Sequence, residues 1–221
     1  MEREFLVLRS FLKDESGISL AEVLLASAMA SIIATAFLVI FSGVSRNVSL
    51  EEERAAALTD VQAGMADLTA ELRQAVRLTA DGPIVEVLEA SGATAELVFH
   101  SDRAEDAAGP ERYRYFLTGC TVTHCSLSRE IKVADSATPP WTYTGAGTTR
   151  VVLNDVLRGP GTLFVGADWT TGSEVLTTSC DLTSPCVFDL IKIDVRIDPD
   201  PNIAAEEALS IHHEVRLRNA R

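Results

Sequence analysis

The sequence predicts an α+β fold in which one long N-terminal helix packs on an antiparallel β-sheet. Two observations support this prediction. All eight prolines of the 221-residue chain lie at Pro83 or later, and a long stretch without proline favours a helix. After Pro83 the apolar residues change from steps of three and four to strict alternation, which is typical of half-buried strands.

The first element is a strongly apolar run from Ile18 to Phe41, in which Glu22 is the only charged residue. A helix of this length spans about 36 Å, which exceeds the ~30 Å hydrocarbon core of a bilayer. Basic residues precede the run, whereas the acidic stretch Glu51–Glu53 follows it closely. The positive-inside rule therefore predicts a single-pass cell-membrane protein with a cytoplasmic N-terminus and everything after Phe41 outside.

Three interpretations of this run are open. A cleaved secretory signal places its apolar core after a short basic start and ends in small residues, but here Ala26 to Ala30 lie inside the run. A plain signal anchor would leave Glu22 close enough to the headgroups to reach them. The third interpretation is a leader peptide that is cleaved off at a site directly N-terminal to the apolar run.

The residues that favour the third interpretation are GISLAEVLL, from Gly17 to Leu25. This stretch resembles the processing site of type IV pilins and of the pseudopilins of type II secretion. The resemblance implies that residues 1–17 are a prepilin leader, that prepilin peptidase cuts after Gly17, and that Ile18 is then N-methylated. Glu22 would be the fifth residue of the mature chain. Most members of the family have phenylalanine where this chain has Ile18.

The single carboxylate also has a physical explanation. A charge inside a membrane helix costs ~2.5–3.5 kcal/mol on insertion scales, so a retained one usually has a partner. Cleavage after Gly17 would create a new ammonium group at Ile18, close in sequence to Glu22. In a fibre, the ammonium of one chain can lie against the carboxylate of the next. We therefore expect Glu22 to be an assembly contact.

Residues 42–80 are predicted to form an amphipathic continuation of this helix, to about Thr79. Apolar residues recur there at steps of three and four, which indicates one buried face: Leu58, Val61, Met65, Leu68, Leu72 and Val76. Gly82 and Pro83 then follow, as expected beyond a helix C-terminus. Gly43 and Gly64 are the predicted weak points of the helix.

Residues 81–221 are predicted to form a β-rich domain outside the cytoplasm. Apolar and polar residues alternate from Ile191 to Asp198 and again from Leu209 to Arg218, so these two strands are expected to form a hairpin. Further strands are predicted at Ile84–Leu88, Glu96–His100, Arg112–Leu117, Ser126–Val133, Arg150–Leu153 and Thr162–Val165. Three segments of this part of the chain resemble J-type minor pseudopilins and related minor pilins: YRYFLTGC, CSLSREIKV and VRLRN.

The four cysteines form two close pairs, Cys120/Cys125 and Cys180/Cys186. Outside the cytoplasm disulfides are the default, and four cysteines permit three connectivities. A hairpin around the first pair would bring its ends together, so we favour the two local bridges. A zinc site remains the alternative, although these spacings are wider than those of most zinc hooks.

The sequence contains little that indicates catalysis, nucleic-acid binding or metal binding. The net charge of −13 gives the chain no electrostatic attraction for nucleic acid. Motifs of serine hydrolases, zinc proteases and nucleotide-binding proteins are absent from the sequence. His212 and His213 alternate faces on a strand and are not expected to act as a pair. The acidic turn Asp198–Asn202 could offer oxygens to calcium but needs no metal, so no cofactor is predicted.

We therefore expect a non-enzymatic subunit, a minor pilin or pseudopilin at or near the tip of a type IV pilus or a type II secretion pseudopilus. Its expected partners are prepilin peptidase, other pilin or pseudopilin subunits and the inner-membrane assembly platform. The alternative is a membrane-anchored extracytoplasmic domain that binds a ligand and never enters a fibre. The two differ in processing, because a simple anchor needs no cut at Gly17.

Overall fold

The computed structural model describes residues 19–79, 82–90, 92–102, 109–158, 161–168, 174–198 and 208–217. The chain divides into two compact units, Met1–Glu52 and Glu53–Arg221. The second is called the head unit from here on. Each unit is described separately, and both contain part of the helix α2, Leu20–Arg73.

Helix α2 has no proline, and it ends where the backbone begins to pair with a strand. Ala75 forms a bridge with Ser101, and the N–H of Val76 donates to the carbonyl of His100 at 2.8 Å. The helix therefore ends at Arg73 and not near Thr79 as predicted, because the next residues exchange helical hydrogen bonds for contacts with the second strand of the sheet.

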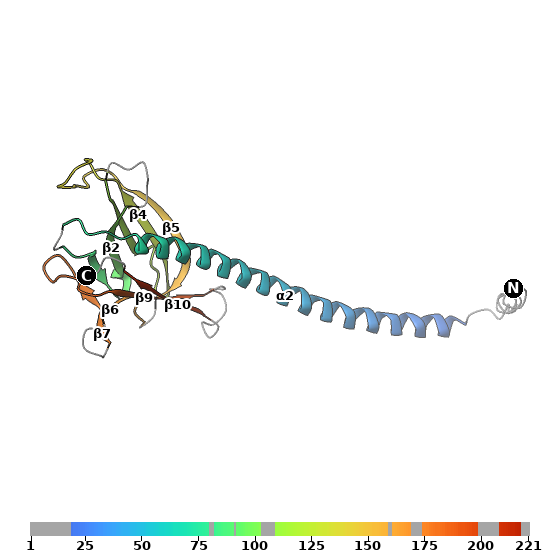
Figure 1. The fold of residues 1–221 in the computed structure, drawn as a ribbon. Coiled ribbons are helices and arrows are strands. Elements are labelled where there is room, and N and C mark those ends of the chain that lie inside the picture. The colour runs from blue at the N-terminus through green and yellow to red at the C-terminus, as the bar shows by residue number, and fades with distance from the viewer. Residues whose placement is uncertain are drawn as a thin grey trace, which may run out of the picture. The chain divides into compact units, whose positions relative to one another are not determined.

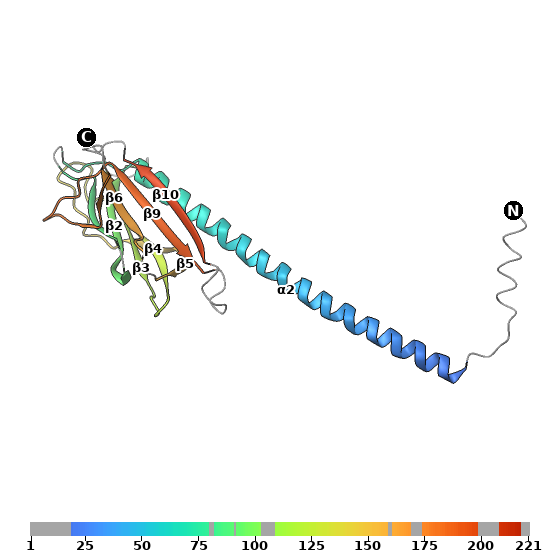
Figure 2. The same ribbon diagram turned by 90° about the horizontal axis from the view of Figure 1, so that it is seen from below.

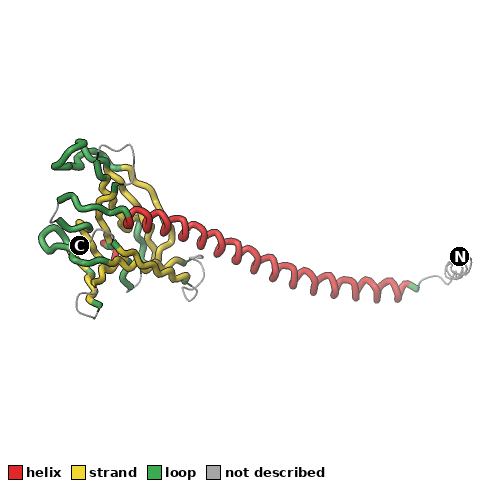
Figure 3. The backbone as a smooth tube through the Cα atoms, viewed as in Figure 1, coloured by secondary structure: helices red, strands yellow, loops and turns green. Residues whose placement is uncertain are grey.

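The head unit contains an antiparallel sheet (Figures 1 and 3), which confirms the predicted α+β class. Its strands are β1 (Val85–Glu89), β2 (Glu96–Ser101), β3 (Glu111–Thr118), β4 (His124–Lys132), β5 (Thr148–Leu157), β6 (Phe164–Asp168), β7 (Val175–Thr177), β8 (Ser179–Cys180), β9 (Leu190–Ile197) and β10 (Leu209–Arg216). The order is β7-β6-β9-β5-β4-β3-β2-β1-β8, and β10 pairs with β9.

Strands β9 and β10 form the predicted hairpin and lie side by side in Figure 2. Their register runs from Leu209 opposite Ile197 to Arg216 opposite Leu190. On β9, the alternate residues Ile191, Ile193, Val195 and Ile197 are buried, as the sequence pattern predicts.

Strands β7 and β8 were not predicted. Each is short, and β8 owes its pairing to β1, in which Leu88 lies opposite Cys180. Such pairing depends on residues far apart in the chain, and three or fewer residues carry too little alternation to reveal a strand.

The part of α2 within the head unit packs its apolar stripe against the sheet. Val61, Met65, Leu68 and Leu72 are buried in one core with strand residues such as Leu97 and Leu127. The helix lies close to β5 at Gly64. A Cβ atom there would lie 2.8 Å from Cγ1 of Val152 and 3.4 Å from its carbonyl oxygen. Gly64 is therefore a close-packing position.

Candidate functional site

The predicted processing site is only partly within the described residues. Gly17 and Ile18 lie outside them, whereas Glu22 lies in the first turn of α2. The helix begins at Leu20, so the predicted cleavage point precedes the first helical residue closely in sequence. Ile18 and Ser19 lie between the two in the sequence.

Ser19 and Glu22 cap the helix reciprocally. The N–H of Ser19 donates to Oε2 of Glu22 at 3.2 Å, and the N–H of Glu22 donates to Oγ of Ser19, also at 3.2 Å. The carbonyl of Ser19 accepts from the N–H groups of Glu22 and Val23 at 3.0 and 3.3 Å. This is a capping box, in which side chains accept from backbone donors at the start of a helix. The N–H of Glu22 is shared between the hydroxyl and the carbonyl of Ser19.

The apolar N-terminal part of α2 is exposed. Every side chain described from Ser19 to Ser49 is exposed, including Leu24, Ile33 and Phe37. Within the described part of the chain, α2 is the one helix long and apolar enough to cross a membrane. By length and composition it fits a membrane anchor or a signal.

The hydroxyl groups of this segment are satisfied within the helix itself. Ser31 donates to the carbonyl of Ser27 at 2.7 Å, and Thr35 donates to the carbonyl of Ser31 at 2.8 Å. Ser27 bonds the carbonyl of Leu24 at 2.9 Å. Such back-bonding removes the cost of an unpaired polar group in an apolar environment.

All four cysteines form disulfides. Cys120 is linked to Cys125 and Cys180 to Cys186, the local pairing that the sequence favours. The first bridge joins the start of the β3–β4 turn to β4, and the second closes a loop that leaves β8. With their sulfurs paired, these cysteines offer no thiolates for the alternative zinc site. Disulfides are typical of an oxidising, extracytoplasmic compartment.

A buried polar network connects α2 to the sheet. Glu71 is 1% exposed, and its carboxylate accepts hydrogen bonds from the phenol of Tyr115 on β3 and the guanidinium of Arg129 on β4. Burial, followed by the charge of Glu71, raises the pKa of Tyr115 above its ordinary value, so the phenol stays protonated.

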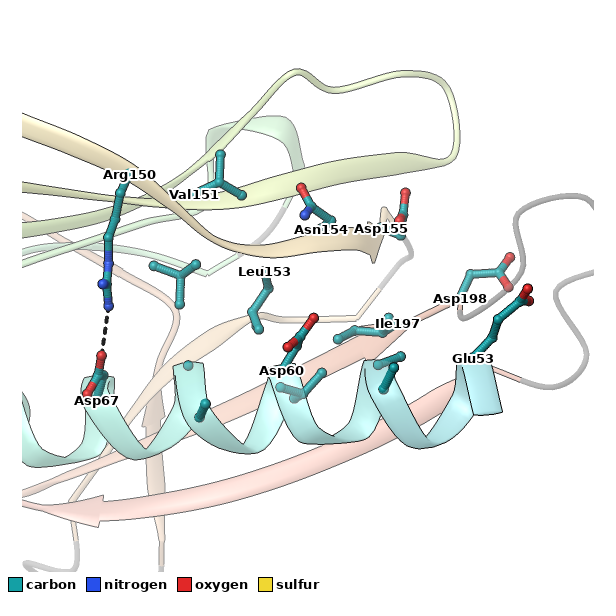
Figure 4. A pocket seen from close by; sticks show the side chains of 16 residues that line it. Glu53, Asp60, Asp67, Arg150, Val151, Leu153, Asn154, Asp155, Ile197 and Asp198 are labelled. Atoms are coloured by element: carbon teal, nitrogen blue, oxygen red, sulfur yellow. Dashed lines mark hydrogen bonds and ion pairs between the residues drawn. The ribbon is translucent and has the colours of Figure 1, made fainter. Parts of the chain in front are cut away.

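A groove of about 650 Å³ lies between the Glu53–Asp67 segment of α2 and the strand β5 (Figure 4). Among the described residues that line it, Arg150 is the only Lys or Arg, and it is paired with Asp67 at 2.7 Å. Asp60 and Asp155 also line the groove. The carboxylates make it more favourable for a cationic group than for an anionic one.

Asp198 is at the end of this groove and is the only residue of the acidic turn Asp198–Asn202 that is described. Its carboxylate lies 3.3 Å from Nε2 of His124, and its N–H donates to the carbonyl of Asp155 at 3.1 Å. Residues 199–202 lie outside the described residues. Among the residues that are described, no group of three or more His, Cys, Asp or Glu side chains is arranged to hold a metal.

The histidines form no joint site. His212 is exposed, and His213, on the other face of β10, is half-buried. His100 is 5% exposed, and its ring lies tilted against that of Tyr143, with centroids 5.1 Å apart. Burial lowers the pKa of His100 to about 4, so it is neutral at pH 7.

Sequence reasoning missed two features that the structure makes prominent. Ser19 and Glu22 follow the S-x-x-E pattern of a capping box directly before an apolar run, a signal that was present in the sequence. Glu71 stands next to Leu72 and one turn after Leu68, so it is a charge on the apolar stripe. That position could have suggested a buried ion pair, although its partners on β3 and β4 could not have been identified.

Comparison of the chain with protein-family models, with curated proteins and with solved structures finds no match.

Proposed function

We propose that this chain is a minor pilin or pseudopilin, made as a prepilin and incorporated, at or near the tip, into a type IV pilus or a type II secretion pseudopilus. One observation carries the proposal. The Gly17–Glu22 motif extends into the capped first turn of a helix whose apolar N-terminal part is exposed, and a β-sheet head with two disulfides follows. A leader, a membrane helix and an extracytoplasmic head in this order are what such a subunit requires.

Glu22 has the central role in the proposed assembly. Prepilin peptidase cleaves after Gly17 and methylates Ile18, whose ammonium then enters the fibre core beside the carboxylate of a neighbouring Glu22. Attraction between unlike charges strengthens as water is excluded, and a buried charge without its counterion costs several kcal/mol. The capping box uses Oε2 of Glu22, and a carboxylate has further acceptor sites for an ammonium group.

The head remains outside the cytoplasm while the apolar helix holds the precursor in the membrane as a single span. Other subunits and the inner-membrane assembly platform are the partners in this scheme. A bulky head is best tolerated at the end of a fibre, where it need not fit a helical lattice. We assign the chain no enzymatic activity.

Mass analysis of the N-terminus of the mature protein, purified from its own host, tests the proposal. A chain that begins at methylated Ile18 is expected. Replacement of Gly17 by a bulky residue should leave an inserted precursor of full length. A mature chain that begins at Met1, or one cut near Ala30, would rule out the pilin assignment.

The acidic groove favours a second candidate, a membrane-anchored domain that binds a cationic ligand and never joins a fibre. Its lining combines several carboxylates with one arginine that is already paired. Such a domain would keep its leader or lose it to a signal peptidase, so the same mass analysis separates the two candidates.

A further inference from the structure

We propose that the groove between α2 and β5 receives one face of a basic helix from a partner protein, a helix that carries Lys or Arg side chains at every seventh position. All residues that line the groove belong to the head unit. The proposal goes beyond the proposed function, because a fibre subunit and a membrane-anchored domain can both use such a surface. It specifies the chemistry and the spacing of the groups that the groove would bind.

The α2 side of the groove repeats every seven residues. Its carboxylates belong to Glu53, Asp60 and Asp67. Seven residues make about two helical turns and ~10.5 Å of rise, so the three carboxylates form a row along the side of α2 that faces β5 (Figure 4). A helix that packs alongside another presents side chains to it at this same interval. A partner helix with basic residues seven apart would therefore match the row.

Small residues occupy the positions between the carboxylates. Ala56 and Ala63 each follow a carboxylate by three residues, and Ala57 and Gly64 follow by four, so they lie on the same side of the helix. Ala56 and Ala63 are also exposed. A helix with its side chains is about 10–12 Å across, and a groove of about 650 Å³ would take up one face of it.

The carboxylates have capacity for a cationic partner. Within the described parts of the chain, Glu53, Asp60 and Asp155 are exposed and their side chains make no hydrogen bond or ion pair with another residue. The third member of the row already binds a guanidinium: Nη2 of Arg150 donates to Oδ2 of Asp67 at 2.7 Å (Figure 4). Basic side chains of a partner would form the corresponding pairs with Glu53 and Asp60.

Apolar groups in the groove favour a helix over a free cation. Val151 of β5 lines the groove and is 51% exposed, and the exposed alanines of α2 lie across from β5. A metal ion or a small polyamine would leave these groups in water, whereas the aliphatic stems of Lys and Arg would cover them. Removal of this apolar surface from water adds to the attraction between the charges.

The experiment measures binding of labelled helical peptides to the full-length chain in micelles by fluorescence anisotropy. One peptide has three arginines at every seventh position, with alanine and glutamine between them. A second peptide has the same composition, but its arginines are spread over different faces. The first should bind about tenfold more tightly, because the second can bring only one arginine at a time to the row, and high salt should weaken binding of both.

Variants of the groove test where the first peptide binds. Glu53→Gln and Asp60→Asn should each lower its affinity about two- to fivefold, and the double variant about tenfold, as expected for exposed charge pairs. Ala56→Trp keeps every charge but fills the groove, so it should abolish binding. The urea midpoint of each variant verifies that the head unit is folded.

Two matched controls should bind the peptide like the wild type. Asp102→Asn removes one exposed charge of the head unit at a position that does not line the groove. Gln62→Trp places the same bulky side chain on α2 at an exposed position that does not line the groove either.

Four results would overturn the proposal. Equal affinity of the two peptides would show attraction without recognition of spacing. Unchanged affinity of the double variant would place the binding site elsewhere. Displacement of the peptide by an equal concentration of Ca²⁺ would assign the carboxylates to a metal ion. Dimers of the full-length chain that dissociate in Ala56→Trp would assign the groove to a second copy. Since none of these results depends on cleavage after Gly17, failure of the proposed function is observed separately, at the N-terminus of the mature chain.

Discussion

Glu71 on α2 and Arg129 on β4 form an ion pair inside the head unit, although they are 58 residues apart in the sequence. The side chains are 1% and 11% exposed. Tyr115 donates to the second oxygen of the same carboxylate. These bonds connect one position of α2 to two particular strand residues, a specific contact that an apolar stripe alone does not provide.

The first prediction concerns this ion pair. Glu71→Ala leaves the partly buried Arg129 guanidinium without this counterion, so it should lower the free energy of unfolding by at most about 3–5 kcal/mol, the range for a fully buried pair. Tyr115→Phe removes one hydrogen bond to a charged group and should cost about 1.5–3 kcal/mol. Urea denaturation of the full chain in micelles measures both.

The exposed residue Asp60 provides a matched control for Glu71, because it lies on the same helix. Asp60→Ala should change the free energy of unfolding by less than about 0.5 kcal/mol. The effects of Glu71→Ala and Arg129→Ala should not add in the double variant, because each removes the same pair. Simple additivity would show that the pair does not exist in solution.

The second prediction concerns the close approach of α2 to β5. In an open helix Gly→Ala is stabilising by roughly 1 kcal/mol. At Gly64 the new Cβ atom would lie 2.8 Å from Cγ1 of Val152 and 3.0 Å from Cδ2 of Leu153. Overpacking of this kind costs about 1–3 kcal/mol, so Gly64→Ala should give a net loss of stability.

Gly43 is the matched control for Gly64, since a Cβ atom added at Gly43 would have nothing within 4 Å. Gly43→Ala should leave the urea midpoint of the head unit unchanged. A higher midpoint for Gly64→Ala would mean that the helix and β5 are farther apart than in the structure.

The third prediction concerns the disulfides. Peptide mapping of the non-reduced, exported protein should find Cys120 linked to Cys125 and Cys180 linked to Cys186. Replacing either pair by alanine should lower the free energy of unfolding by about 2 kcal/mol, because the closed loops are short and constrain the unfolded chain little. Free thiols, or stoichiometric zinc that a chelator removes, would contradict this assignment and the oxidising compartment.

The fourth prediction concerns pH. Burial lowers the pKa of His100 from 6.5 to about 4 in the folded state, so the unfolded chain binds a proton that the folded chain does not. Stability should therefore be unaffected by His100 above about pH 6.5 and should fall as the pH is lowered from 6.5 towards 4, by a few kcal/mol in total.

His100→Gln removes this titration, and the comparison with the wild type isolates it from carboxylates that titrate in the same range. The difference between the two stability curves should change between pH 6.5 and 4 and stay constant above. His212→Gln, at an exposed position, serves as the control. A constant difference over the whole range would mean that His100 is protonated normally in the folded state.

Much of the head unit could be predicted from its sequence, because patterns within short segments identify the strands and the buried face of the helix. Alternation identifies β9 and β10, and the spacing of Val61, Met65 and Leu68 identifies the buried face of α2. The end of α2 at Arg73 could not be predicted, because Ala75 and Val76 are drawn into pairing with β2. The same applies to β7 and β8, whose pairing is decided by distant strands.

In the candidate site, too, one feature could be predicted from local sequence and another could not. The capping box is a local pattern and was available in the sequence at Ser19 and Glu22. The groove between α2 and β5 was not, because its carboxylates come from α2, β5 and the residue after β9, Asp198. Whether any of these acidic residues faces solvent or a groove depends on how the helix crosses the sheet.

The assembly role assigned to Glu22 is tested by whether Glu22→Gln is incorporated into a fibre. The variant keeps its capping oxygen, and its insertion should be slightly easier because a charge is removed from the apolar segment. It should be cleaved and its head should fold as in the wild type. Incorporation should fail, because the ammonium of a neighbouring chain would enter the apolar core without a counterion.

The measurement is crosslinking and co-purification of the mature chain with its partner subunits in the host, normalised to its level in the membrane. Glu52→Gln, which removes the same charge from α2 outside the apolar run, should behave like the wild type. Processed Glu22→Gln is expected at normal levels in the membrane, with its crosslinks to partner subunits lost. A processed variant that is crosslinked as efficiently as the wild type would contradict the role assigned to Glu22.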